Sequence, residues 1–278
     1  MNVLELTGAI WLGALAAGFL GSLTGLGGGV VIVPLLTLGF GVDIRYAIGA
    51  SLVSVIATSS GAAIAYVREG YTNIRVGMLL EIATTLGASL GALLAAIVAP
   101  KIIAIIFGVV LVSSVYHSPH ERTDGVGDGE PDTLSVRLRL DGTYPGSEGV
   151  RSYHVRRVPL GFGLMAFAGA LSGLLGIGSG AMKVLAMDQA MRIPFKVSTT
   201  TSNFMIGVTA AASAGIYLNR GYIDPGLAMP TMLGVLLGSL LGARVLVGAR
   251  TKVLRLVFAG VILALGIEML YNALSGRF

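Results

Sequence analysis

A single shift of 151 residues, which carries Gly25 onto Gly176, brings the two halves of this 278-residue chain into register without a gap. The glycine-rich stretch Gly25–Gly29 then falls on Gly176–Gly180. Further matches continue along the chain: Arg45 on Lys196, Tyr66 on Tyr217, Gly70 on Gly221, Tyr71 on Tyr222, Asn73 on Asp224, Gly87 on Gly238 and Phe107 on Phe258. Such a repeat indicates two equivalent structural units. We predict repeat 1 at 1–116, a polar connector at 117–158 and repeat 2 at 159–278, together forming one domain.

The composition places both repeats in a lipid bilayer. Hydrophobic residues make up 54% of the chain and charged residues only 12%, with a mean hydropathy of +0.84. Of the 19 basic and 14 acidic residues, six and seven lie between His117 and Pro159. This pattern excludes a soluble enzyme, a secreted disulfide scaffold and an ordinary DNA-binding domain. We expect the lipid bilayer as a partner and no nucleic acid, because no basic stripe with interleaved aromatic residues accompanies the net charge of +5.

The apolar segments predict an all-α polytopic membrane protein. Uninterrupted helices are expected at about 46–66, 75–98 and 102–116 and at the matching places in repeat 2. The segment before them is interrupted by glycines: Gly8–Leu23 would form about 24 Å of helix and Val30–Phe40 about 17 Å. Both are shorter than the hydrocarbon core of about 30 Å. Each repeat is therefore predicted to hold one glycine-broken re-entrant hairpin and three transmembrane helices.

The distribution of basic residues favours inverted repeats. If the hairpins re-enter, fourteen Lys and Arg residues, including six arginines of the connector, share one face and four lie on the other, with Lys183 set aside. If the interrupted segment instead crosses the membrane once, ten of these Lys and Arg residues lie on one face and eight on the other. The positive-inside rule then predicts a cytoplasmic connector and both termini outside.

The connector shows alternating apolar and polar residues at Thr133–Leu140 and Val150–Val158. With the turn residues between them, these stretches predict a small β-hairpin. All three histidines, His117, His120 and His154, lie in the connector, and their irregular spacing does not support a zinc site. We expect no bound metal and no cofactor.

The two glycine turns are the strongest candidates for a binding site. Helix breaks at matching places of inverted halves are typical of a transporter's substrate site, because free backbone N–H groups at half-helix N-termini can hold an anion. Close helix packing is the alternative role of such glycines. The candidate substrate-binding residues at the turns are Thr24, Gly25, Gly27, Gly28, Gly29, Gly176, Gly178, Ser179 and Gly180.

Lys183 is the one basic residue deep within an apolar run, and its counterpart under the shift is Ile32. A cation there is costly and indicates an anion site, although Lys183 could instead reach an interface or pair with Glu81. Glu81 lies well inside an apolar helix and could carry a coupling proton or act as a charge partner.

Other polar residues follow the hairpins. Ser51 in repeat 1, and Thr201, Ser202 and Asn203 in the run Ser198–Asn203 of repeat 2, could bind a sulfonate, carboxylate or phosphate. Arg45 and Lys196 could steer anions into the two mouths, or they could be ordinary interfacial side chains.

The stretch Gly87–Gly91 satisfies G-x-S-x-G, the pattern of serine hydrolases, but no strand precedes it and every histidine lies in the connector. Its counterpart Gly238–Gly242 keeps the small-residue spacing, so both indicate helix packing, within a protomer or in a homodimer. We therefore predict that the protein is not an enzyme.

The paired motifs Gly25–Gly29 and Gly176–Gly180, with Gly49-Ala50-Ser51 and Ser198–Asn203 after them, resemble those of the TauE/SafE family of bacterial sulfite and organosulfonate transporters. The resemblance covers both repeats. It implies a permease of the bacterial cytoplasmic membrane that moves small sulfur-containing anions such as sulfite, sulfoacetate or related sulfonates without ATP hydrolysis. A passive anion channel, or a membrane scaffold acting through the connector, are the alternatives that the residues leave open.

Overall fold

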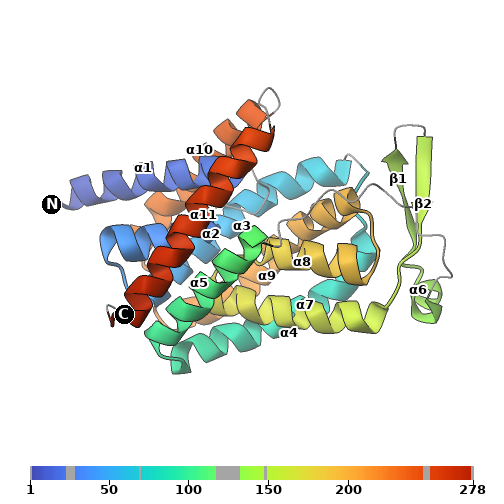
Figure 1. Ribbon diagram of the computed structural model, residues 1–278, viewed down its shortest axis with the longest axis horizontal. Coiled ribbons are helices and arrows are strands. Elements are labelled where there is room, and N and C mark those ends of the chain that lie inside the picture. The colour runs from blue at the N-terminus through green and yellow to red at the C-terminus, as the bar shows by residue number, and fades with distance from the viewer. Residues whose placement is uncertain are drawn as a thin grey trace.

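The computed structural model describes residues 2–22, 29–68, 70–116, 132–146, 149–246 and 251–276, which are mostly helical (Figure 1). The first half contains α1 (Val3–Ser22), α2 (Gly29–Pro34) with the π-helical turn η1 (Leu35–Gly39), α3 (Ile44–Arg68), α4 (Ile74–Ile97) and α5 (Pro100–Tyr116). The second contains α7 (Val158–Leu175), α8 (Gly180–Leu185) with η2 (Ala186–Ala190), α9 (Phe195–Asn219), α10 (Pro225–Leu246) and α11 (Thr251–Leu274). The uninterrupted helices predicted from the apolar segments are confirmed. The first limb of the interrupted segment is longer than the predicted Gly8–Leu23, because α1 holds 20 residues, about 30 Å of helix.

The elements recur with the period of the sequence. α2 and α8, η1 and η2, and α3 and α9 each begin and end 151 residues apart, and α4 and α10, like α5 and α11, begin 151 residues apart. The packing has the same symmetry: α1 packs on α10, and their counterparts α7 and α4 pack on each other. α3 packs on its own counterpart α9, and α5 packs on its counterpart α11. Each half therefore completes its packing on the other half.

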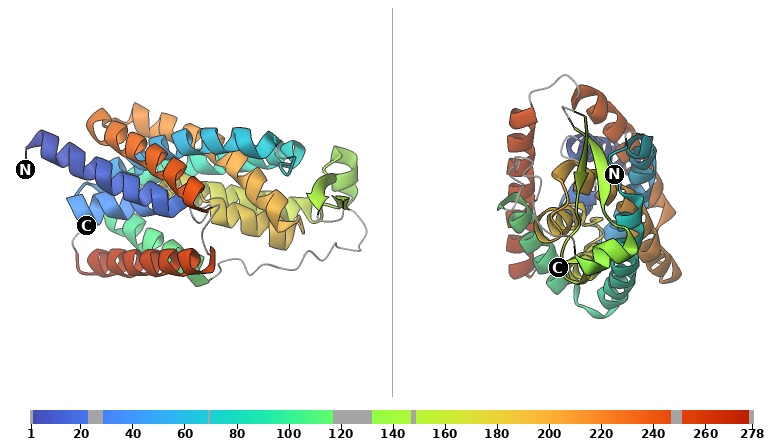
Figure 2. Two further views of the ribbon diagram at one scale, coloured as in Figure 1. Left: turned by 90° about the horizontal axis from the view of Figure 1, so that it is seen from above. Right: turned by 90° about the vertical axis from the view of Figure 1, so that its right-hand side faces the viewer.

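The corresponding helices α3 and α9 run antiparallel. The Arg45 guanidinium, at the start of α3, lies 5.7 Å from the centre of the Tyr222 ring, just beyond the end of α9. Lys196 Nζ, at the start of α9, lies 5.9 Å from the Tyr71 ring, just beyond the end of α3. α1 begins and α11 ends at one end of the molecule, and the connector lies at the opposite end (Figure 1, Figure 2).

Glycines allow the paired helices to approach at backbone contact. A Cβ atom at Gly87 on α4 would clash with the Ala166 carbonyl of α7, and one at Gly238 on α10 would clash with the Leu15 carbonyl of α1. The predicted role of the Gly87 stretch in helix packing is confirmed. Gly238 serves packing within the chain.

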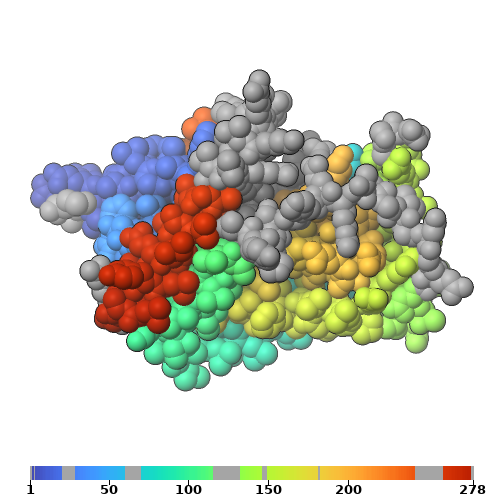
Figure 3. Space-filling view, in the orientation of Figure 1, coloured from blue at the N-terminus to red at the C-terminus, as the bar shows by residue number. Residues whose placement is uncertain are grey.

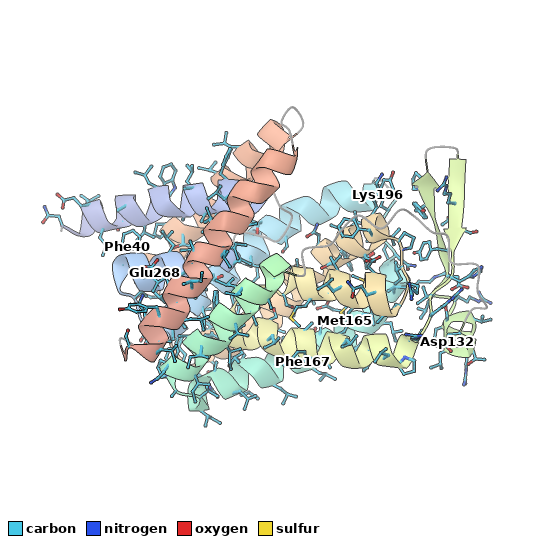
Figure 4. All side chains as sticks on the ribbon, in the orientation of Figure 1. Phe40, Asp132, Met165, Phe167, Lys196 and Glu268 are labelled. Carbon is cyan, nitrogen blue, oxygen red and sulfur yellow. The ribbon has the colours of Figure 1, made fainter. Side chains whose placement is uncertain are left out.

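The outer faces of α4 and α10 are apolar. Exposed large side chains occur at every fourth position, and the 151-residue shift relates the two stripes: Met78, Ile82, Leu86 and Leu90 on α4, and Met229, Leu233, Leu237 and Leu241 on α10. Phe167 is likewise exposed on α7 (Figure 4), and α7, α5 and α11 are among the helices visible on the side drawn in Figure 3. Among the described residues, α4 and α7 are long and apolar enough to cross a membrane. A soluble monomer rarely exposes so continuous an apolar surface, whereas lipid covers it well.

The connector contains a short helix and a hairpin. The hairpin joins β1 (Gly142–Gly146) to β2 (Gly149–Tyr153) in antiparallel pairing, so the connector does contain a small two-stranded sheet, although its first strand is not the predicted one. The predicted first strand at Thr133–Leu140 is wrong, because Thr133–Leu138 forms helix α6. The Asp132 side chain accepts a hydrogen bond from the Leu134 N–H, and Arg139 ends the helix in a left-handed conformation. These end caps outweigh an alternation that covers only eight residues.

The connector is held to the bundle by polar contacts. Asn73, which caps α4, donates to the Leu140 carbonyl at 2.9 Å and to the Tyr153 hydroxyl at 2.6 Å. Burial raises the pKa of Tyr153 to about 12. His117 and His120 lie outside the described residues, and within those described no three His, Cys, Asp or Glu side chains gather as a metal site would require.

Asp141 organises the connector itself. Its carboxylate accepts hydrogen bonds from the Ser135 hydroxyl at 2.7 Å and the Val155 N–H at 2.8 Å, and it pairs with His154 Nδ1 at 2.9 Å. Burial alone would raise the pKa of Asp141, but the hydrogen bonds to the charged carboxylate outweigh it, and the pKa lies below its ordinary value.

Candidate functional site

The described parts of the two glycine turns lie against α3 and α9, where these helices pack together. The Ser51 hydroxyl on α3 lies 2.8 Å from the Gly176 carbonyl and 3.4 Å from the Gly29 carbonyl, and it can donate to either. Its counterpart on α9, Ser202, donates to the Gly180 carbonyl at 3.1 Å. The contact of Ser51 with Gly29 thus recurs as that of Ser202 with Gly180. The fold brings the two turns together across the halves.

The second turn has a backbone that favours glycine. Gly176, which ends α7, and Gly178 have φ angles of 68° and 70°, which residues with a Cβ atom rarely adopt. Ser179 follows with φ 44° and is buried, and its hydroxyl has no hydrogen-bond partner in the described part of the chain. A buried hydroxyl normally finds a partner, which makes Ser179 a candidate for the site. The first-turn candidates lie outside the described residues: Thr24, Gly25, Gly27 and Gly28.

Lys183 lies on α8, three residues beyond Gly180, and is fully buried. Its Nζ donates a hydrogen bond to the Thr209 hydroxyl of α9 at 2.6 Å. An ammonium has three N–H donors, and no other acceptor among the described residues takes the remaining two. The cation therefore keeps donor capacity inside the bundle.

Glu81 on α4 completes this cluster. Thr209 Oγ1 lies 2.8 Å from Glu81 Oε1, and Thr85 donates to the same oxygen at 3.1 Å. Lys183 and Glu81 make no direct ion pair; the Thr209 hydroxyl connects them. Glu81 Oε2 is buried and accepts no hydrogen bond from any described residue. A charge-separated pair linked by one hydroxyl thus lies in the interior of the bundle.

The other hydroxyl side chains in the run Ser198–Asn203 make different contacts. Thr201 Oγ1 accepts a hydrogen bond from the Asn73 N–H at 3.0 Å, which fixes the loop between α3 and α4. Thr199 and Thr200 donate to carbonyls of their own helix. Asn203 is half-buried. The structure therefore brings Ser202 to the turn and turns Thr201 toward the loop.

Arg45 and Lys196 lie at opposite ends of the bundle. The Arg45 guanidinium donates to the Ala95 and Val98 carbonyls, both at 3.1 Å, and so caps the end of α4. Lys196 is exposed at the end that carries the connector (Figure 4). Carbonyl groups at the C-terminal end of α4 thus hold the Arg45 guanidinium, whereas the Lys196 side chain is exposed.

Sequence reasoning missed Thr209, which joins the two buried charges. A signal was present: Thr209 follows Ser202 by two helical turns, so both lie on one face of α9. Thr85 was missed as well, although it follows Glu81 by one helical turn and therefore lies on the same face of α4.

The comparisons with known proteins agree with this architecture. The model of the family described as sulfite exporter TauE/SafE matches residues 10–269. The probable membrane transporter protein YunE of Bacillus subtilis is 28% identical over 281 residues, covering 94% of this chain and 96% of its own length. A probable membrane transporter protein of Xylella fastidiosa (strain 9a5c) is 27% identical over 98% of both chains. No solved structure shows a significant match. The chain therefore belongs to the TauE/SafE family and is a membrane transporter.

Proposed function

We propose that this transporter carries small sulfur-containing anions, such as sulfite, sulfoacetate or related sulfonates, by alternating access and without ATP hydrolysis. The observation that carries the proposal is Lys183, a fully buried ammonium beside the second glycine turn with two N–H donors left over among the described contacts. Buried cations in membrane proteins mark substrate and ion pathways. The description of the matching family supports the choice of sulfur oxyanions.

The rest of the proposed site comes from both turns. The buried Ser179 hydroxyl would donate to an anion oxygen, and Ser51 and Ser202 hold the turns against α3 and α9. Backbone N–H groups at the turns would supply further donors. Thr24, Thr201 and Asn203 remain candidates for hydrogen bonds in another state of the cycle.

Alternating access would follow from inverted repeats. The antiparallel course of α3 and α9, which correspond under the 151-residue shift, supports this arrangement. α2 with η1 holds eleven residues, about 17 Å of helix at 1.5 Å per residue, against a core of about 30 Å. Such a limb fits a re-entrant hairpin that stops near mid-membrane. Two inverted halves around a central site would rock to open either mouth.

The orientation follows from the basic residues. Arg75 donates to the Arg139 carbonyl of the connector, and Lys196 lies near Tyr71 at the same end. Arg45 and Arg220 contact the C-terminal end of α4, which lies away from the connector. The connector contributes six of the fourteen basic residues assigned to its face, so the positive-inside rule favours a cytoplasmic connector with both termini outside. The resemblance to the bacterial family supports a location in the cytoplasmic membrane of a bacterial cell.

Thermal unfolding of the detergent-solubilised protein with sulfite, methanesulfonate, sulfoacetate, acetate and phosphate tests the proposal. Binding to the folded state raises the melting temperature by mass action. We expect stabilisation by sulfur oxyanions and its loss in Lys183→Ala. Counterflow in proteoliposomes then separates a carrier from a channel, because a channel gives no saturable exchange. No shift with any anion at millimolar concentration would overturn the anion site.

A further inference from the structure

The buried charges balance each other in the structure as it stands. Lys183 Nζ and Glu81 Oε1 lie on either side of the Thr209 hydroxyl, at 2.6 and 2.8 Å. One ammonium and one carboxylate together give the cluster a net charge of zero. A neutral cluster avoids the high cost of an uncompensated charge in an environment of low dielectric constant.

An arriving anion disturbs that balance. If it binds Lys183 while Glu81 stays ionised, the cluster carries two negative charges and one positive charge, and the carboxylate repels the anion. If Glu81 is protonated, the loaded cluster again has a net charge of zero. Charge neutrality in the membrane interior therefore favours one proton for each monovalent anion.

Glu81 has a place for that proton. Its Oε2 atom is buried and accepts no hydrogen bond from any described residue, while Oε1 is held by Thr209 and Thr85. Protonation at Oε2 forms one O–H bond and leaves the contacts of Oε1 in place. The proton comes from a hydronium ion in the water of the open side: one O–H bond of the hydronium ion breaks as the Oε2–H bond forms, and a water molecule is left.

No other titratable side chain competes for this role among the described residues packed on Glu81. α4 packs on α7, which has none, and on α9, where Lys196 and Tyr217 lie two or more turns from Thr209. From α8, Lys183 is the charged group that acts on the carboxylate. The pair is thus electrostatically isolated.

We propose that Glu81 takes up one proton for each monovalent anion that binds at Lys183, which makes the transporter a proton–anion symporter. The proposal rests on the anion site of the proposed function. Thr209 holds the two charges together when the site is empty, and it releases the ammonium to the anion when the carboxyl is neutral. Anion and proton then bind cooperatively, and each raises the affinity of the protein for the other.

Isothermal titration of the purified protein with methanesulfonate, a monoanion that does not itself titrate near neutral pH, counts the protons. Repeating the titration in buffers of different ionisation enthalpy gives the number taken up. We expect one proton per anion, and an affinity that falls about tenfold per pH unit where Glu81 is ionised in the empty protein. Glu81→Gln should take up none and bind with an affinity independent of pH.

Glu268→Gln on α11 is the matched control, because it makes the same chemical change in an apolar helix away from the cluster and should keep the proton uptake. Infrared difference spectra of the wild-type protein provide a measurement that does not depend on a variant's folding. A new band of a protonated carboxyl group should appear when methanesulfonate is added.

The outcomes separate the two proposals. Binding of methanesulfonate without proton uptake and without a carboxyl band overturns the symport and leaves the anion site standing. If methanesulfonate fails to bind, sulfite replaces it, with the proton count corrected for the titration of sulfite itself. Failure of both anions to bind overturns the anion site, and the symport with it.

Discussion

The two halves of the molecule share a frame but differ in chemistry. The Arg45–Tyr222 contact at one end recurs as the Lys196–Tyr71 contact at the other, and Ser51 meets Gly29 as Ser202 meets Gly180. The helix caps correspond as well, since Asn73 caps α4 and Asp224 accepts from the Gly226 N–H at the start of α10. These shared contacts fix how the helices pack.

The difference lies in the charged cluster. Under the 151-residue shift, Lys183 corresponds to Ile32 and Glu81 to Met232, while Thr84 and Thr85 correspond to Val235 and Leu236. Thr209 alone keeps its type, as Thr58. In the proposed mechanism, the symmetric frame would let both halves move in equivalent ways. The single cation, Lys183, would bind one small anion, so the proposed binding chemistry rests on the residues that differ between the halves.

The largest effect should come from Lys183→Ala, which leaves Glu81 buried without its partner. Breaking a buried pair in this way costs about 3–5 kcal/mol. Ile32→Val at the corresponding position should cost only about 0.5–1.5 kcal/mol. Chemical denaturation in detergent measures both. Removing both charges in Lys183→Ala with Glu81→Ala should be less harmful than Lys183→Ala alone, and a plainly additive loss would contradict the pairing.

Glycine substitutions test the shared frame. Gly87→Ala and Gly238→Ala each force a Cβ atom against a carbonyl of the partner helix and should destabilise by about 1–3 kcal/mol. Because the two contacts are related by the repeat, similar losses are expected in both halves. Gly163→Ala on α7, where no heavy atom lies within 4 Å of the added Cβ, is the control and should not destabilise. A loss of stability in one variant alone would contradict the equivalence of the two helix contacts.

Thr209→Val against Thr58→Val sharpens the difference between the halves. Valine at position 209 removes the hydroxyl that links Lys183 to Glu81, and leaving buried groups unsatisfied should cost about 1–2 kcal/mol. Among the described residues, the Thr58 hydroxyl bonds only carbonyls of its own helix, at Ser54 and Val55, so its loss should stay within about 0.5 kcal/mol. Melting curves of both variants measure these losses. Equal shifts of the melting temperature would contradict the role of the Thr209 hydroxyl as the link between Lys183 and Glu81.

The smallest effect concerns the connector, which has no counterpart in the repeat. The pKa of Asp141 lies below its ordinary value, so its stabilising contribution is present above that ordinary value, near 3.8, and is lost as the pH falls further. Because the pair with His154 is open to solvent, the contribution should be below about 1 kcal/mol. Hydrogen exchange of β1 and β2, corrected for intrinsic rates, should rise below about pH 4. In Asp141→Asn this pH dependence should vanish.

Much of the fold could be predicted because its signals are local. The bounds of α3 and α4 follow from continuous apolar runs to within two residues, and the close packing at Gly87, though not its partner α7, follows from small-residue spacing. α6 could not be predicted, because eight alternating residues fit a strand as well as a helix, and its caps depend on Asp132 and Arg139. In the site, Lys183 and Glu81 were identified by their rarity in apolar helices, but their common partner was not.

The sequence by itself determined the repeat, the helices and the two buried charges, because periodicity, hydrophobicity and the cost of a charge in lipid act on each segment separately. Only the tertiary structure decided that α3 and α9 pack against each other, that Ser51 reaches Gly176 across the halves, and that Thr209 lies between Lys183 and Glu81. These contacts join residues far apart in the chain. A hydroxyl acquires a bridging role only when the packing of helices brings two opposite charges within reach of it.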